Sequence, residues 1–348
     1  MVCTHATIIP YVRRSACTHS PTSTGHFGEP VNLERVPQLS TSGRRVPYAF
    51  AAALTLATLL TACSGSEQPP NTSSATPSEF TVPVTASTVE VLDAGSEPRQ
   101  SLRMSAPVGT TQAATLITSA VVSQQIDHQP VKDFSSPEIT IPLTAVVTTA
   151  ASAQSPTTVV DLTLSDMSTP DATLQAALGG ADGSGAGLSI TESGSITALR
   201  LRPAGDSANA ARAAIEQAFG QAVYRTVALP DAPVGVGARW TVKQEVSSEI
   251  LLDQTTTVIL TARDGDRLTF SVEVSQTPQS SVWNLAGNAG ILNIDQYVMA
   301  GSGTVTVDMT LPLPISGDMS IGGDQAYSDP DGSSVIKQSI TNTIRWTQ

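Results

Sequence analysis

Apolar and polar side chains alternate with a period of two along several segments of the chain. The clearest alternation covers residues 138–147, 268–275, 304–313 and 336–346. A period of two predicts strands with one buried and one solvated face, as in an antiparallel sheet. Weaker alternation at 113–122, 157–164, 196–201, 240–246 and 255–262 brings the expectation to about nine or ten strands.

One longer segment has a helical pattern instead. A helix is expected to begin after Gly205, with Asp206 or Ser207 as its N-cap, and to end at Gly220. Its apolar positions fall on one stripe that reaches Phe219.

A shorter helix is expected from Pro170 to Leu178, followed by a flexible loop, Gly179–Gly187, which contains five glycines. The order of these elements predicts an α+β fold that is predominantly β. We expect a large curved antiparallel sheet with one main helix, residues 206–219, packed on its concave side.

The segment before the first strands has the pattern of an export signal. Arg44 and Arg45 precede an uncharged run, Ala49–Ala62, and a Ser/Pro-rich stretch follows directly. A basic region, a short apolar region and small residues before a cleavage point are typical of a secretory leader. At about 14 residues the run is shorter than the roughly 20 that span a bilayer, so a transmembrane anchor fits less well.

The end of that run, Leu60-Thr61-Ala62-Cys63, resembles the lipobox of bacterial lipoproteins. In that family the cysteine sulfur receives a diacylglyceryl group, and the leader is cut just before the cysteine. The resemblance implies that the lipoprotein-processing enzymes bind and process the chain. It also implies an anchor of acyl chains on Cys63, which holds the protein on the extracytoplasmic face of the cell membrane.

These features divide the chain into four parts. Residues 1–35 are interpreted as a mis-called start or a disordered extension, because a leader begins only a few residues before its arginines. Residues 36–62 form the signal peptide, and residues 63–79 the lipidated Cys63 with a flexible tether rich in Pro, Ser and Thr. Residues 80–348 are expected to form a single β-rich extracytoplasmic domain.

The charge of the chain excludes one class of partner. Residues 1–63 contain five Arg and two Glu, so the rest of the chain has 13 basic and 28 acidic residues, a net charge of −15. Binding to nucleic acid needs clustered basic side chains, and so acidic a chain is not expected to provide them. The same charge opposes adsorption to anionic lipid head groups, which leaves Cys63 as the expected membrane contact.

Signals for catalysis or metal binding are weak. His128 is the one histidine after residue 63, and no Gly-x-Ser-x-Gly motif accompanies it, so we interpret it as a loop residue. One histidine and no free thiol argue against zinc. Two Asp/Gly-rich segments, Asp182–Gly185 and Asp329–Gly332, are typical of turns and lack the distal Glu of an EF-hand loop. We therefore expect no enzyme, no metal and no cofactor.

The most distinctive stretch is Leu229-Pro230-Asp231-Ala232-Pro233-Val234-Gly235-Val236-Gly237-Ala238-Arg239-Trp240. It resembles a Leu-Pro-x-x-Pro-Val-x-Val-Gly-x-x-Trp segment in an uncharacterised family of actinobacterial lipoproteins. The resemblance covers most of residues 85–348 and implies an exported, lipid-anchored β-rich protein with no established activity. The segment also has a structural explanation, in which the prolines fix a turn, the glycines permit positive φ and Trp240 anchors the sheet.

Three classes of function remain open. A binding or carrier module would hold an apolar or envelope ligand between sheet and helix, an architecture that resembles lipid-carrying lipoproteins of mycobacteria. A structural or protein-interaction lipoprotein would expose an apolar patch that contains Trp283, Leu285, Ile291 and Tyr297. A wall-polymer hydrolase would need facing acids with perturbed pKa values. We expect the first class.

Overall fold

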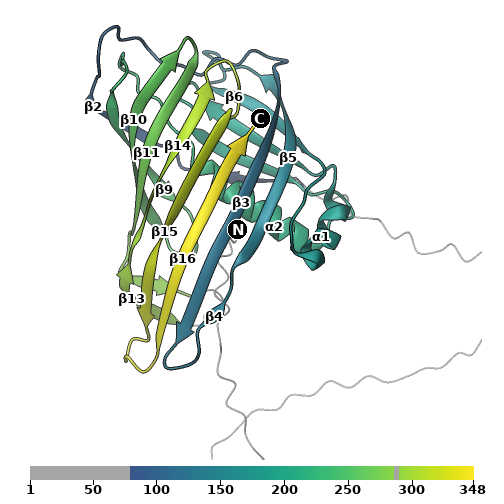
Figure 1. Cartoon of the computed structure of the whole chain (residues 1–348), viewed down its shortest axis with the longest axis vertical. Coiled ribbons are helices and arrows are strands. Elements are labelled where there is room, and N and C mark those ends of the chain that lie inside the picture. Colours follow the sequence, from purple (N-terminus) through teal and green to yellow (C-terminus); the bar gives the residue numbers. More distant parts are fainter. Residues whose placement is uncertain (1–78, 286–289) are drawn as a thin grey trace, which may run out of the picture. The chain divides into compact units, whose positions relative to one another are not determined.

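A computed structural model describes residues 79–285 and 290–348, which form one large curved antiparallel sheet (Figure 1). The hydrogen-bonded order is β1-β8-β7-β6-β5-β3-β16-β15-β14-β11-β10-β9-β2, with β4, β12 and β13 paired outside this path. The path begins at β1 and ends at β2, so the sheet is not closed. The expectation of a large, mostly antiparallel sheet is confirmed.

The first eight strands are β1 (Phe80–Pro83), β2 (Thr88–Asp93), β3 (Thr111–Ile126), β4 (Lys132–Asp133), β5 (Ser136–Thr149), β6 (Thr157–Leu164), β7 (Gly185–Thr191) and β8 (Ile196–Arg202). The others are β9 (Arg239–Val246), β10 (Leu252–Asp264), β11 (Arg267–Pro278), β12 (Val282–Asn284), β13 (Ile291–Tyr297), β14 (Met299–Asp308), β15 (Ser316–Ser328) and β16 (Val335–Thr347). The helices are α1 (Ala172–Leu178), the 3₁₀ turn η1 (Gly179–Ala181) and α2 (Asn209–Val223).

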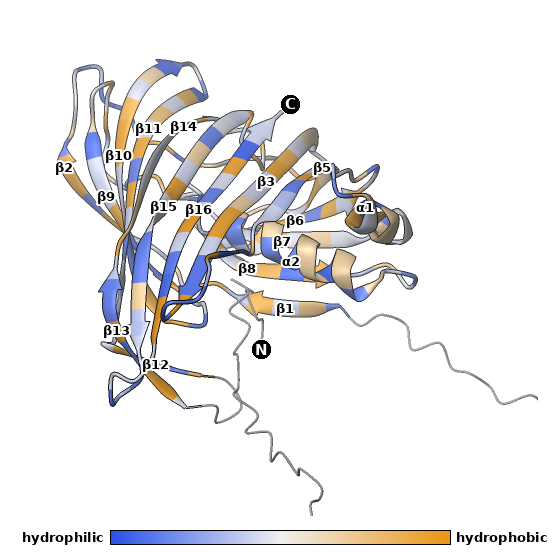
Figure 2. Cartoon of the chain, turned by 60° about the horizontal axis from the view of Figure 1, so that its bottom comes forward, coloured by the Kyte–Doolittle hydropathy of each residue, from blue (hydrophilic) through white to orange (hydrophobic). Residues whose placement is uncertain are grey.

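The long strands bury alternate side chains, as a period of two requires. In β5, Ile139, Ile141 and Leu143 are buried, while the residues between them are more exposed. Bands of hydrophobic and hydrophilic residues follow one another along β3 and β16 (Figure 2). The buried faces of the strands and of α2 belong to one hydrophobic core. A smaller cluster of Trp283, Leu292 and Tyr327 joins β12, β13 and β15.

Helix α2 begins and ends later than its sequence pattern predicts. Its N-cap is Ala208, which makes no side-chain capping bond. Ser207 is buried instead, with its Oγ 3.4 Å from the Oγ of Ser184. Gly220 lies buried inside the helix, which continues to Val223 because the last turn is also buried in the core.

The glycine-rich segment after α1 is not the loop that composition predicts, because its last residues belong to β7. Gly187 lies opposite Arg200 of β8, and a Cβ at Gly187 would come within 2.3 Å of an Arg200 nitrogen. The glycine therefore leaves room for an arginine side chain that lies across the strand. Arg200 forms ion pairs with Asp161 of β6 and, at 3.5 Å, with Glu79.

The strand predicted at 304–313 ends early, at Asp308. The Asp308 carboxylate accepts hydrogen bonds from the backbone N–H and the hydroxyl of Thr310, at 2.9 and 2.6 Å. Pro312 follows and has no N–H to donate to a neighbouring strand. Local turn chemistry therefore overrides the alternation of apolar residues.

Several strands of the sheet are absent from the prediction. Gly317, Gly322 and Gly323 obscure the alternation in β15, yet this strand pairs with β14 on one side and β16 on the other. The short strands β12 and β13 pair with each other, and β13 also pairs with the end of β15. Their positions depend on contacts with distant strands, which local sequence does not contain.

Candidate functional site

A cavity of about 170 Å³ lies between the C-terminal end of α2 and the inner face of the sheet. Strands β3, β11 and β13–β16 contribute to its wall, together with β12 and the connection between β9 and β10. The apolar part of the wall includes Val122, Ile250, Leu252, Trp283, Met299 and Ile340. All of these residues except Ile250, which lies in the connection between β9 and β10, belong to strands of the sheet.

A row of glutamines crosses this inner face. Gln124 of β3 lies opposite Gln338 of β16, which lies opposite Gln325 of β15. Farther along the sheet, Gln276 of β11 lies opposite Gln254 of β10. All five side chains are buried, and Gln276, Gln325 and Gln338 line the cavity. The row gives an otherwise apolar interior a polar stripe.

Four of the glutamines form two hydrogen-bonded pairs, and the fifth, Gln325, is bonded to a tyrosine. Gln338 Nε2 donates to Gln124 Oε1 at 2.8 Å, and Gln276 Nε2 donates to Gln254 Oε1 at 2.9 Å. The hydroxyl of Tyr327 donates to Gln325 Oε1 at 2.7 Å. Buried amides need such partners because desolvation without a hydrogen bond is costly. In the described part of the chain, Gln338 Oε1 is buried and has no donor.

Arg225 follows α2 and lies where the row of glutamines meets the helix. Its Nη1 donates to Gln254 Oε1 at 2.8 Å. Burial lowers the pKa of Arg225 to about 10, while the nearby Tyr297 acts in the opposite direction. The guanidinium is therefore charged at neutral pH. Among residues 79–285 and 290–348, it forms no ion pair with a carboxylate.

Two tyrosines add hydroxyl groups to the same wall. Burial raises the pKa of Tyr297 to about 12, and the neighbouring Arg225 charge moderates this effect. Burial also raises the pKa of Tyr327, with further contributions from Tyr297 and Glu249. Both phenols therefore keep their protons at physiological pH. The Tyr327 hydroxyl already donates to Gln325, so Tyr297 is the one of the two that can donate to a ligand.

A second cavity of about 60 Å³ lies on another side of α2. Its wall is mostly apolar and includes Leu188, Ile196, Phe219, Val305, Leu313 and Trp346. Arg225 lines this cavity as well as the larger one. Arg225 thus contributes to the walls of both cavities.

The four residues considered for an exposed interaction patch do not form one. Trp283 is buried, and its ring lies 5.3 Å from the ring of Tyr327. Tyr297 lines the larger cavity, and Leu285 packs against the cluster of Trp283. Ile291 alone of the four is largely exposed, at 48%. The aromatic residues of this group therefore belong to the cavity.

The residues weighed for catalysis or metal binding lie apart from this cavity. His128 is exposed in the turn after β3. Asp329 and Gly332 are in the turn between β15 and β16, where the Gly332 N–H donates to the Asp329 carbonyl. Hydrogen bonds from Ser333 lower the pKa of Asp331, in the same turn. In the described residues, no group of three or more His, Cys, Asp or Glu side chains is placed to hold a metal ion.

The stretch from Leu229 to Trp240 has a structural role. Trp240 is fully buried in β9, its indole N–H donates to the Ala228 carbonyl at 2.9 Å, and its ring meets Phe270 edge-on at 5.7 Å. The turn uses the positive φ that its glycines predict, since Gly237 has a φ of +86°.

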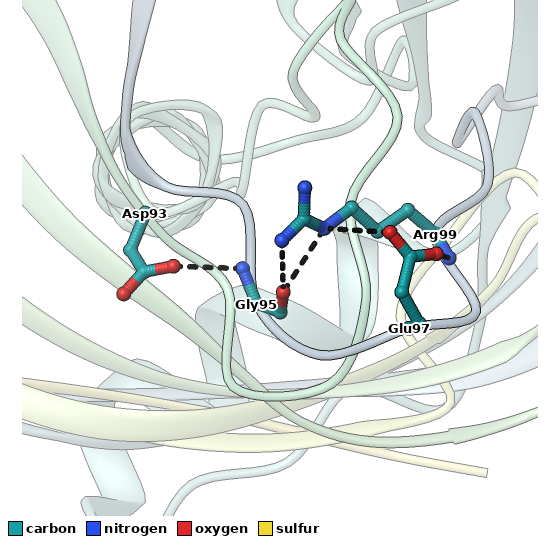
Figure 3. Close-up of polar contacts among 4 residues, drawn as sticks. All are labelled: Asp93, Gly95, Glu97 and Arg99. Atoms are coloured by element: carbon teal, nitrogen blue, oxygen red, sulfur yellow. Dashed lines mark hydrogen bonds and ion pairs between the residues drawn. The ribbon is translucent and has the colours of Figure 1, made fainter.

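The loop after β2 holds this turn in place. The Gly235 N–H donates to the Ala94 carbonyl at 2.9 Å. Within the loop, Asp93 accepts from the Gly95 N–H at 2.9 Å, and the Arg99 side chain donates to the Gly95 carbonyl at 2.9 and 3.0 Å (Figure 3). Glu97 completes the loop with an ion pair to Arg99 at 3.6 Å.

The predicted lipidation site, Cys63, and the lipobox residues Leu60, Thr61 and Ala62 lie outside the described residues, as do residues 1–35 and the tether up to residue 78. Within the described residues, no helix combines the length and apolarity that crossing a membrane requires.

No protein-family model matches the chain, and a search of curated proteins finds no similar sequence.

Proposed function

We propose that the protein is a non-enzymatic binding or carrier module that holds an apolar or envelope ligand in the cavity beside α2. The observation that carries the proposal is the cavity of about 170 Å³, with Trp283, Met299 and Ile340 in its wall. Natural cores are close-packed and contain few voids larger than a water molecule, so a space of this size lined by apolar side chains supports a ligand site. In this proposal α2 is the main helix, and its C-terminal end closes one side of the cavity.

The proposal includes a membrane anchor on Cys63, because a carrier of apolar molecules gains from being close to the bilayer that supplies them. The resemblance of residues 60–63 to a lipobox supports this part. Two or three acyl chains on one cysteine anchor a protein firmly, whereas one chain binds only marginally.

Tryptophan fluorescence offers a direct test of where the ligand binds. The probe is dibromostearate, whose bromines quench a nearby indole, added to the full chain in a non-ionic detergent. We expect saturable quenching in the wild type and a loss of most of this quenching in Trp283→Phe, because Trp283 lines the cavity. Trp240→Phe is the matched control, since Trp240 is buried in the sheet core away from either cavity. Quenching that survives Trp283→Phe unchanged would contradict the proposed site.

A further inference from the structure

We infer that the ligand of this cavity is an acidic amphiphile whose anionic group binds Arg225. The inference rests on the proposed function and adds the chemical class of the ligand. Arg225 is the one basic residue in the walls of the two cavities that the structure describes, and it lines both of them.

The hydrogen bonds of Arg225 leave most of its donors available. A guanidinium has five N–H donors in a planar fork. In residues 79–285 and 290–348, the side chain donates one hydrogen bond, from Nη1 to Gln254 Oε1. None of its nitrogen atoms is among the buried polar atoms that lack a partner, so the remaining donors are accessible. Arg225 lines both cavities.

The charge on Arg225 is also costly in this position. Removing a cation from water is unfavourable unless an anion or a set of acceptors compensates for it. The lowered pKa of Arg225, caused mainly by burial, shows that protein groups compensate only in part. A bound anion would supply the missing interaction. A ligand that carries an anion would therefore explain why a charged residue lies in these largely apolar walls.

The other charged and titratable groups around Arg225 fit this assignment. Tyr297 lines the same cavity, interacts electrostatically with Arg225, and stays protonated, so it can donate to the same anion. Glu249 is the acidic residue of the larger cavity wall, and it lies in the exposed connection between β9 and β10, where its charge acts on Tyr327. Gln338 Oε1 also lies in this wall without a donor among the described residues, but as a hydrogen-bond acceptor it cannot bind the anion itself. The deep part of the wall therefore combines one cation with neutral polar groups.

The class of ligand follows from these walls. A guanidinium matches the paired oxygens of a carboxylate or a phosphate group. Apolar walls on both sides fit a hydrocarbon chain attached to that group. Fatty acids and anionic phospholipids share this chemistry, and a free inorganic anion lacks the chain.

The test compares dibromostearate with its methyl ester, which has the same chain and no charge, on the full chain in a non-ionic detergent. We expect the wild type to bind the acid at least about tenfold more tightly, a difference of about 1.4 kcal/mol. Arg225→Gln should remove this preference, because it weakens binding of the acid much more than binding of the ester. Arg225→Lys should retain part of it. Arg267→Gln is the matched control, because Arg267 is exposed on β11 and the charge change is the same.

Each outcome bears on one proposal. Equal binding of acid and ester by the wild type, or equal loss of both in Arg225→Gln, would overturn the anion assignment while the carrier proposal stands. If the wild type binds neither probe, the carrier proposal itself fails. Inorganic phosphate alone should not displace the acid, and displacement by phosphate would point to a free anion instead of an amphiphile. If Arg225→Gln does not fold, the preference of the wild type for the acid should still fall as pH rises through about 10, where Arg225 loses its proton.

Discussion

Arg225 Nη1 and Gln254 Oε1 lie 2.8 Å apart, where the second residue after α2 reaches the buried face of β10. Gln254 also accepts a hydrogen bond from Gln276 and donates one to the Tyr224 carbonyl, at 2.9 and 2.8 Å. One amide thus connects the helix end, two strands and the cation between the cavities. The position of Arg225 depends on this connection.

Replacing Gln254 should therefore destabilise the fold. Gln254→Leu leaves the Tyr224 carbonyl and the donors of Gln276 and Arg225 without their partner, so we expect a loss of about 2–3 kcal/mol in the free energy of unfolding. Urea denaturation measures this loss. Gln296→Leu on β13 makes the same replacement at an exposed position and should stay within about 0.5 kcal/mol of the wild type. Equal effects of the two replacements would contradict the network.

The turn before β9 allows a prediction with a matched pair of glycines. A Cβ at Gly235 would lie 1.8 Å from the Ser96 carbonyl oxygen, whereas a Cβ at Gly237 meets no atom within 4 Å. Gly235→Ala should cost about 3 kcal/mol because the loop after β2 must move. Gly237→Ala should cost about 1–2 kcal/mol, since only the positive φ opposes it. Thermal or urea unfolding that ranks Gly237→Ala as the more damaging change would refute this packing.

The pKa of Tyr297 predicts how stability changes in alkali. In the folded chain burial raises the pKa to about 12 from an ordinary value of 10.0, so the unfolded chain ionises first. The contribution of this phenol is fully present below about pH 10 and is lost as pH rises toward 12. Tyr297→Phe should therefore lose less stability than the wild type between about pH 10 and pH 12. Arg225 titrates in both proteins with the opposite effect on stability, and its pKa is lower still in the variant, where the charge of Tyr297 no longer raises it. An identical pH dependence in the two proteins would contradict the burial of Tyr297.

The anchor is tested by Cys63→Ala. If acyl chains on Cys63 hold the protein in the membrane, the variant should carry no fatty-acid label and should not be cut as a lipoprotein. Metabolic labelling with a fatty-acid probe, followed by fractionation of wild-type and variant cells, measures both. A labelled variant, or a wild type without label, would disprove the anchor.

The buried faces of the long strands could be predicted from the sequence. Ile139, Ile141 and Leu143 alternate with less apolar residues, and these three side chains are the ones that the sheet buries. The ends of the elements could not be predicted equally well. Asp308 stops β14 through its bonds to Thr310, inside a run of apolar alternation. Such competition between local turns and strand pairing is decided by tertiary contacts.

The cavity itself was not predictable, because it depends on where α2 lies against the strands. Two signals for its polar groups are nevertheless present in the sequence. Gln338 lies between Ile336 and Ile340 on the same face of the strand, and its side chain is buried. An apolar residue would be expected at this position in a core without a polar site. Arg225 is a single cation in an otherwise uncharged stretch, residues 217–230. In both cases a polar residue interrupts an apolar stretch. The interruption shows that the position is unusual, but it does not show which residue or ligand the side chain contacts.

Native mass spectrometry of the full chain, purified in a mild detergent, tests the central claim most directly. If the cavity beside α2 holds a ligand, the native spectrum should show the chain with an additional non-covalent mass in the range of a lipid. That mass should disappear when the protein is denatured, while any lipid on Cys63 remains. Native and denatured spectra that give the same mass, with or without acyl chains, would contradict the account.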